Sequence, residues 1–139
     1  MALVIPNAGE ADTASYYVNK SAPQNLVLRL YTNNYTPIGS STTGSFTEAT
    51  GGGYVALEIN GADWTITPGA PTVAAAPQQT FSCDGTGAVQ LCYGYFFTRA
   101  SSGTVAHAER FPNGPYSFTN DGDAIKISPR IEFSSSLND

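Results

Sequence analysis

Short runs of alternating apolar and polar residues, separated by turn-forming residues, constrain this chain more than any other feature. The clearest run lies near the C-terminus, where Ile125, Ile127, Ile131 and Phe133 share one parity. Residues 26–31 alternate in the same way. Because side chains of a β-strand point alternately to the two faces of a sheet, a period of two predicts half-buried strands.

About eight such segments follow one another at short spacing, with turn residues between them. The pattern predicts an all-β fold, a single antiparallel β-sandwich with jelly-roll-like winding, and a barrel is the alternative. Asn60-Gly61 between two alternating runs predicts a two-residue hairpin. Pro77 and Pro129 interrupt two of the segments, which indicates edges or bulges. Residues 89–98 are apolar on both parities, which indicates a central strand.

The N-terminal region has a different character from the rest. We expect residues 1–24 to form an extended arm and residues 25–139 to form the β-sandwich domain. Residues 9–20 carry acidic side chains early and Lys20 late, a pattern that suits a short helix, and Pro23 ends it. The first ten residues lack the basic region of a secretory signal.

Charged residues are scarce. They make up 12% of the chain, against about 25% in ordinary soluble proteins. This depletion fits either a polar β-protein or a subunit whose surface is covered in an assembly. The six basic residues are scattered and the net charge is −5, so we expect no nucleic-acid partner. No run approaches the roughly 20 apolar residues of a membrane span, so we expect no membrane partner.

The two cysteines, Cys83 and Cys92, flank a glycine-rich segment that has the composition of a hairpin turn. A hairpin would place the sulfurs opposite each other, where a disulfide is sterically feasible. Reduced thiols are the default without a secretory signal. Two cysteines without a neighbouring histidine or acid are too few ligands for zinc.

Two further patterns suggest chemistry but have a simpler structural explanation. His107 and Glu109 share one strand face, as a histidine–carboxylate general base requires, yet no motif supplies a nucleophile. Asp121 and Asp123 imitate the start of a calcium loop, but no glutamate completes it, and turn chemistry explains them. We therefore predict no catalytic, cofactor-binding or metal-binding residues.

Glycine and tryptophan mark two more positions of interest. Gly51-Gly52-Gly53 lacks the lysine of a phosphate-binding loop, which favours a hinge or a close backbone approach. Trp64 could serve as an aromatic platform for a sugar, but it is in phase with Ala62 and Ile66. That phase favours a core position.

Several short segments, in order along the chain, resemble small structural proteins of tailed bacteriophages. The matching segments are Leu28-Arg29-Leu30-Tyr31-Thr32-Asn33-Asn34-Tyr35-Thr36-Pro37, Phe46-Thr47-Glu48, Gly53-Tyr54, Trp64, Pro77-Gln78-Gln79-Thr80-Phe81, Tyr93-Gly94-Tyr95-Phe96, Ala108-Glu109-Arg110-Phe111 and Gly122-Asp123.

This resemblance implies a role in the virion and no enzymatic activity. The best-fitting role is a capsid decoration, or cement, protein that binds the outer capsid surface and stabilises the head. Its expected partners are the major capsid protein and copies of itself, in a symmetric array. The arm and the polar connection 33–53 would then be ordered by contact with the capsid. The alternative is a tail or baseplate protein, such as an adhesin that binds glycans.

Overall fold

The computed structural model describes residues 3–134 and shows an antiparallel all-β protein with one α-helix near its N-terminus. Within this range there are eleven strands, more than the expected eight or so. The difference has a local cause, because three of the expected segments are each divided into two strands. The divisions fall at Pro77, at Tyr93 and at Pro129.

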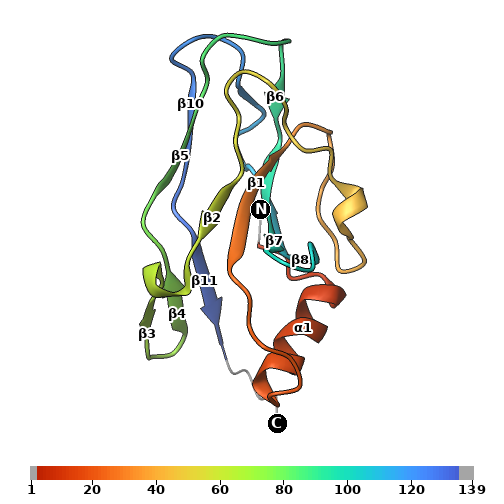
Figure 1. The fold of residues 1–139 in the computed structure, drawn as a ribbon, viewed down its shortest axis with the longest axis vertical. Helices are drawn as coiled ribbons and strands as arrows, with labels where there is room; N and C mark the ends of the chain where they lie inside the picture. Colours follow the sequence, from red (N-terminus) through yellow and green to blue (C-terminus); the bar gives the residue numbers. More distant parts are fainter. Residues whose placement is uncertain (1–2, 135–139) are drawn as a thin grey trace.

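The largest sheet has four strands in the order β2-β1-β7-β8 (Figure 1). Its members are β2 (Leu57–Ile59), β1 (Leu26–Tyr31), β7 (Gly94–Arg99) and β8 (Val105–Arg110). The strand expected to be central, β7, lies between β1 and β8, and five of its six residues are buried. The prediction from its two apolar faces is therefore confirmed.

A long two-stranded ladder faces this sheet. Its upper part pairs β5 (Gln79–Ser82) with β10 (Ala124–Ile127), and its lower part pairs β4 (Thr72–Ala75) with β11 (Arg130–Phe133). The two parts are joined where the Ala76 amide donates to the Pro129 carbonyl at 3.1 Å. Proline cannot donate to a ladder, so the breaks at Pro77 and Pro129 follow from the sequence.

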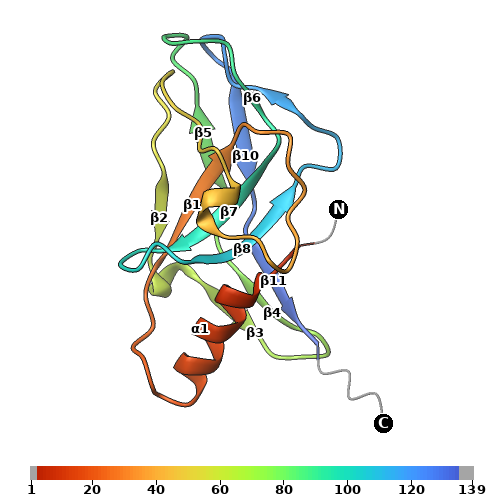
Figure 2. The same ribbon diagram turned by 90° about the vertical axis from the view of Figure 1, so that its right-hand side faces the viewer.

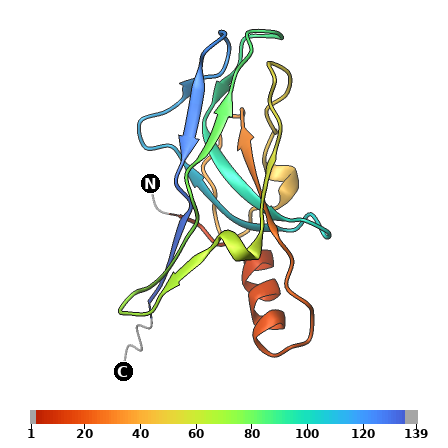
Figure 3. The ribbon, with the colours of Figure 1, turned by 60° about the vertical axis from the view of Figure 1, so that its left-hand side comes forward.

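The lower part of the ladder widens into a three-stranded sheet. Here β3 (Thr65–Thr67) adds to β4, giving the order β11-β4-β3, which we call the lower sheet. Figure 3 shows the lower sheet extending away from the body on the opposite side from helix α1. A short pairing of β6 (Leu91–Cys92) with β9 (Tyr116–Ser117) completes the strands.

The main core lies between the four-stranded sheet and the upper ladder. Leu30 and Phe97 contribute from the sheet, and Phe81 and Ile125 contribute from the ladder. Each large side chain that is fully buried in this way stabilises the fold by roughly 1.5–3 kcal/mol. The antiparallel all-β class is confirmed. The jelly-roll winding stays a prediction, because hydrogen bonding divides the strands among four small sheets.

The Asn60-Gly61 hairpin prediction is wrong. The chain forms the 3-10 turn η2 (Gly61–Asp63) there and passes from β2 in one sheet to β3 in another. The Asn25 side chain holds this turn, since its Oδ1 accepts from the Gly61 amide at 3.2 Å. Ile66, expected in the core, is 59% exposed.

The connection between β1 and β2 is ordered by this chain itself, which corrects the expectation that a partner would be needed. It includes the 3-10 turn η1 (Thr43–Ser45). Next to this turn, the Phe46 ring stacks on Phe96 at 4.6 Å and meets Tyr35 edge to face at 5.5 Å. This second core lies on the outer face of the four-stranded sheet. The three glycines 51–53 adopt positive φ, and Gly52 approaches the Cys83 sulfur closely, as the close-approach interpretation requires.

The predicted N-terminal helix is confirmed as α1 (Asn7–Tyr17). Its N-terminal part lies against β8, whereas residues 17–23, at and beyond its C-terminal end, are exposed (Figure 2). Val4 exchanges backbone hydrogen bonds with Ala108 of β8, at 2.8 and 2.9 Å. Gly9 lies directly on the backbone of Ala106, so closely that a Cβ at this position would collide with the Ala106 carbonyl oxygen. The helix is thus seated on β8 through a glycine.

Candidate functional site

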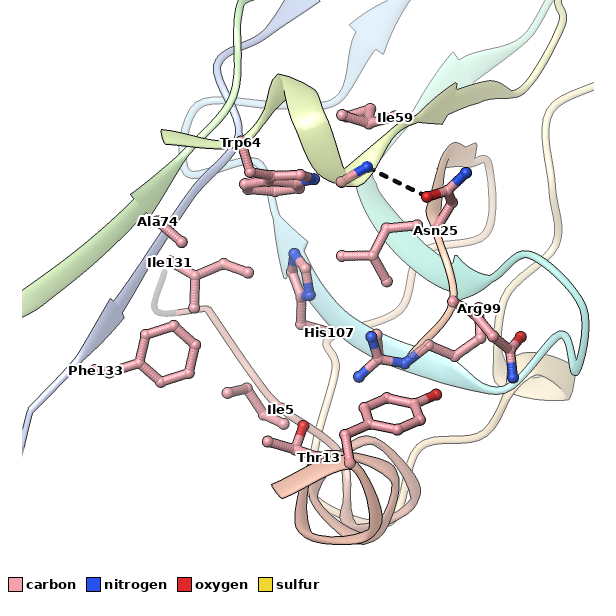
Figure 4. A pocket seen from close by; sticks show the side chains of 15 residues that line it. Ile5, Thr13, Asn25, Ile59, Trp64, Ala74, Arg99, His107, Ile131 and Phe133 are labelled. Atoms are coloured by element: carbon pink, nitrogen blue, oxygen red, sulfur yellow. Dashed lines mark hydrogen bonds between the residues drawn. The ribbon is translucent and has the colours of Figure 1, made fainter. Parts of the chain in front are cut away.

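A cavity of about 300 Å³ opens between helix α1 and the lower sheet. Figure 4 shows that its lining comes from segments distant in sequence. The walls are mainly apolar, and Trp64 and Phe133 are their largest apolar side chains. The other lining residues are Ile5, Thr13, Tyr16, Gln24, Asn25, Leu26, Ile59, Gly61, Ala74, Arg99, Ala106, His107 and Ile131.

A β-bulge in β8 shapes the cavity wall. Phe97 pairs with His107 and Thr98 pairs with Val105, so Ala106 is an extra residue between them. A bulge redirects the side chains around it. Ala106 and His107, although adjacent in sequence, both line the cavity as a result. The sequence of this segment contains no pattern that predicts the bulge.

His107 lies in the middle of the lining side chains (Figure 4). Its side chain is 4% exposed, and its ring stacks on Phe97 at 4.3 Å with an interplanar angle of 27°. Burial, aided by the positive charge of Arg99, lowers the pKa of His107 to about 3. The imidazole is therefore neutral at ordinary pH, with one nitrogen that donates and one that accepts. Within residues 3–134 the ring makes no hydrogen bond.

Arg99, at the end of β7, places a cation in the cavity wall. Its side chain is 12% exposed and its guanidinium lies over the Tyr16 ring at 4.8 Å. The nearest carboxylate oxygen, Asp12 Oδ2, is 3.7 Å from Arg99 Nε, which is too long for a hydrogen bond. Both atoms are buried without a hydrogen-bond partner among the residues that the structure describes. The sequence does not identify Arg99 as a site residue, because no local pattern indicates that Tyr16 and Asp12 pack beside it.

His107 and Glu109 share a face, as expected, but they do not form a catalytic pair. Glu109 Oε2 accepts a hydrogen bond from the Tyr95 hydroxyl at 2.7 Å. This contact and the burial of the ring raise the pKa of Tyr95. The carboxylate is therefore engaged across the strand and does not orient the imidazole.

The acidic turn before β10 has a structural role. Asp123 Oδ2 accepts from the amides of Thr119 and Asn120 at 3.0 and 2.9 Å, and from the Ser117 hydroxyl at 3.1 Å. These hydrogen bonds hold the pKa of the Asp123 carboxyl below its usual value. Among residues 3–134, no three potential ligand side chains gather into a metal site.

The two cysteines are free thiols in the same core. The predicted hairpin between them is wrong, because β5 leads to Cys83 and pairs with β10, whereas β6 contains Cys92 and pairs with β9. Burial raises the pKa of the Cys92 thiol to about 11, with a smaller contribution from Cys83 nearby. The Cys92 thiol is thus protonated, and both cysteines are buried away from solvent.

The lower sheet carries a second candidate surface. All three residues of β3 are exposed, and the strand pairs with β4 on one side only. Ile66 on β3 is 59% exposed and Phe133 on β11 is 49% exposed. An exposed edge strand presents backbone donors and acceptors that another chain can pair with.

Comparison with known proteins gave no match to any family model, curated protein or solved structure. In the part of the chain that the structure describes, no helix has the length and hydropathy to cross a bilayer.

Proposed function

We propose that this protein is a non-enzymatic structural protein of a tailed-phage virion, most specifically a decoration protein that binds the outer capsid surface and stabilises the head. The observation that carries the proposal is the exposed edge of the lower sheet, formed by β3, with the apolar side chain of Ile66 at its centre. The resemblance of the sequence to small phage structural proteins supplies the biological context. The capsid protein is the expected partner.

The chemistry of this edge suits assembly. Monomeric proteins usually protect an edge strand by keeping it short or with a charge, a proline or a bulge. Strand β3 is short, with three residues, but its sequence Thr-Ile-Thr contains no charge and no proline. An extended segment of a capsid subunit can add to such an edge by backbone hydrogen bonds, with Ile66 as an apolar contact. The low charge of the whole chain fits a surface that is partly covered in an assembly.

We place the proposed attachment surface on the β3 edge and not on the N-terminal segment. Because Val4 and Gly9 pack on β8, deleting residues 3–24 would expose the cavity and the β8 backbone as well as remove any contact with the capsid. A deletion would therefore not separate loss of attachment from loss of stability. Single substitutions on the β3 edge make that separation.

The test is co-sedimentation of the purified protein with separated heads and tails of the phage that encodes it. We expect saturable binding to heads, at a stoichiometry that follows capsid symmetry. Ile66→Lys should abolish this binding because it places a charge on the contact edge. Val89→Lys is the matched control, since Val89 is also exposed, at 79%, but lies outside the lower sheet. Both variants should keep the parent melting temperature.

The results discriminate between the candidate roles. Equal loss of binding in both variants, or none in either, would show that the β3 edge is not the attachment surface. Binding to tails would support the alternative of a tail or baseplate protein and would call for a glycan screen. An enzymatic role is less well supported, because His107 and Glu109 do not converge on one site.

A further inference from the structure

The cavity between α1 and the lower sheet contains an arginine whose hydrogen-bonding capacity is unused. The other three arginines donate side-chain hydrogen bonds, Arg29 to Glu48, Arg110 to the Tyr35 carbonyl and Arg130 to Glu132. Arg99 makes none within residues 3–134, although it is the most buried of the arginines that form ion pairs. Burying a charged donor without a partner is costly. Arg99 can therefore donate to a hydrogen-bond acceptor on a ligand, because this part of the chain provides none.

The charge of the lining indicates the sign of that group. Arg99 is the only side chain of the cavity lining that is charged at neutral pH, because the His107 imidazole is neutral and Asp12 does not line the cavity. A guanidinium presents a planar fork of donors that matches a carboxylate. The neutral imidazole beside it is also free of hydrogen bonds and can donate to a second acceptor atom.

The walls indicate the rest of the ligand. Apart from Arg99 and His107, most of the lining is apolar, with Trp64 and Ile59 on one side and Ile131 and Phe133 on another (Figure 4). The volume of about 300 Å³ is about twice that of a cavity that holds one benzene ring. It matches the lower limit of known small-molecule pockets. A compact apolar body therefore fits, whereas a free phosphate would leave these walls without contacts.

We propose that this cavity binds a small amphipathic carboxylate, whose carboxylate group pairs with Arg99 and whose apolar body packs against Trp64 and Phe133. The ligand would cover the side of α1 that faces the lower sheet and link these two elements. The cavity adjoins the β3 edge, since Ala74 of its lining pairs with Ile66, but this proposal does not rest on attachment to the capsid.

The chain contains one tryptophan, and it lines the cavity, so binding has a direct optical signal. The probes are octanoate and 3-phenylpropanoate, with 1-octanol and 3-phenylpropan-1-ol as neutral matches. We expect saturable changes in Trp64 fluorescence and a heat of binding with each acid. Each acid should bind roughly tenfold or more tightly than its alcohol, the ratio expected for a hydrogen bond to a charged group.

Variants assign the selectivity to Arg99. Arg99→Met keeps the apolar stem and should weaken binding of the acids by roughly tenfold or more, with little effect on the alcohols. Arg130→Met is the matched control, because Arg130 is an exposed arginine outside the cavity lining. Asp12→Asn removes the competing carboxylate and should tighten binding of the acids. This variant tests the proposal even if Arg99→Met does not fold.

Three results would overturn the proposal. Equal affinity of each acid and its alcohol for the parent protein would remove the carboxylate assignment. No saturable signal with any probe would show a cavity that holds water only. If Asp12→Asn and Arg99→Met, tested as separate variants, both bind the acids as tightly as the parent protein does, Arg99 is not the residue that binds the carboxylate.

Discussion

Acidification is expected to weaken this protein through its only histidine. His107 is 4% exposed, and burial together with Arg99 lowers its pKa from 6.5 to about 3. Below about pH 6.5 the unfolded chain binds a proton on this imidazole, whereas the folded protein does not bind one until near pH 3. The contribution of His107 to stability is therefore complete above pH 6.5 and is lost progressively as the pH falls from 6.5 toward 3.

The magnitude follows from this single proton. Well below pH 6.5 the free energy of unfolding should fall by about 1.4 kcal/mol per pH unit. Between about pH 7.5 and about pH 5 the integrated loss is about 2 kcal/mol. The hydrogen-bonded carboxylates Asp84 and Asp123 do not contribute in this window. Their pKa values are lowered from 3.8, so the stability that they supply is lost only at more acidic pH.

The assay is urea unfolding, followed by Trp64 fluorescence and far-ultraviolet circular dichroism, at these two pH values. His107→Phe is the reference variant, because phenylalanine keeps an aromatic ring against Phe97 and cannot titrate. Its free energy of unfolding should change by less than about 0.5 kcal/mol over the same interval, which leaves room for minor carboxylate effects. If parent and variant lose the same stability, His107 is not buried in the neutral form and the reasoning is refuted.

Three further predictions test the packing. Gly9→Ala should destabilise the protein by about 2 kcal/mol. The added methyl group collides with the Ala106 backbone, at a cost of up to about 3 kcal/mol, and the higher helix propensity of alanine offsets only about 1 kcal/mol. A gain of stability in urea unfolding would show that α1 does not pack on β8 at this position. Glu48→Ala should cost about 2–3 kcal/mol in the same assay, since it removes the contact of Arg29 Nη1 with both carboxylate oxygens and a tyrosine hydrogen bond at 2.8 Å. A change below about 0.5 kcal/mol would mean that this network is not formed in solution. Cys83 and Cys92 should react with a thiol reagent only as fast as the protein unfolds, because both are buried; rapid labelling of the folded protein would contradict their placement.

The β class, the strand positions and the N-terminal helix could be read from the sequence because they depend on local patterns. Alternation located β1 and β8 within a residue or two, and the unbroken apolar run identified β7 as central. Proline marked the breaks at Pro77 and Pro129 for a covalent reason, since its nitrogen carries no proton to donate. None of these inferences required knowledge of a distant partner.

The choice of partners could not be read in the same way. Asn60-Gly61 has the composition of a hairpin turn, but β2 and β3 each find a better partner, in β1 and β4. Cys83 and Cys92 are separated for the same reason. A strand pairs with whichever edge buries its apolar face and satisfies its backbone, and that edge is set by the whole fold.

Local periodicity in the sequence is enough to predict an antiparallel β domain with an N-terminal helix, because backbone and side-chain periodicity act over a few residues. The tertiary structure was needed to show that the helix returns to β8, that a bulge turns Ala106 inward beside His107 and that Arg99 lies in a cavity wall. Each of these depends on contacts between residues far apart in the chain. Their geometry is fixed by close packing and by the need to satisfy buried polar groups, and neither leaves a local signal.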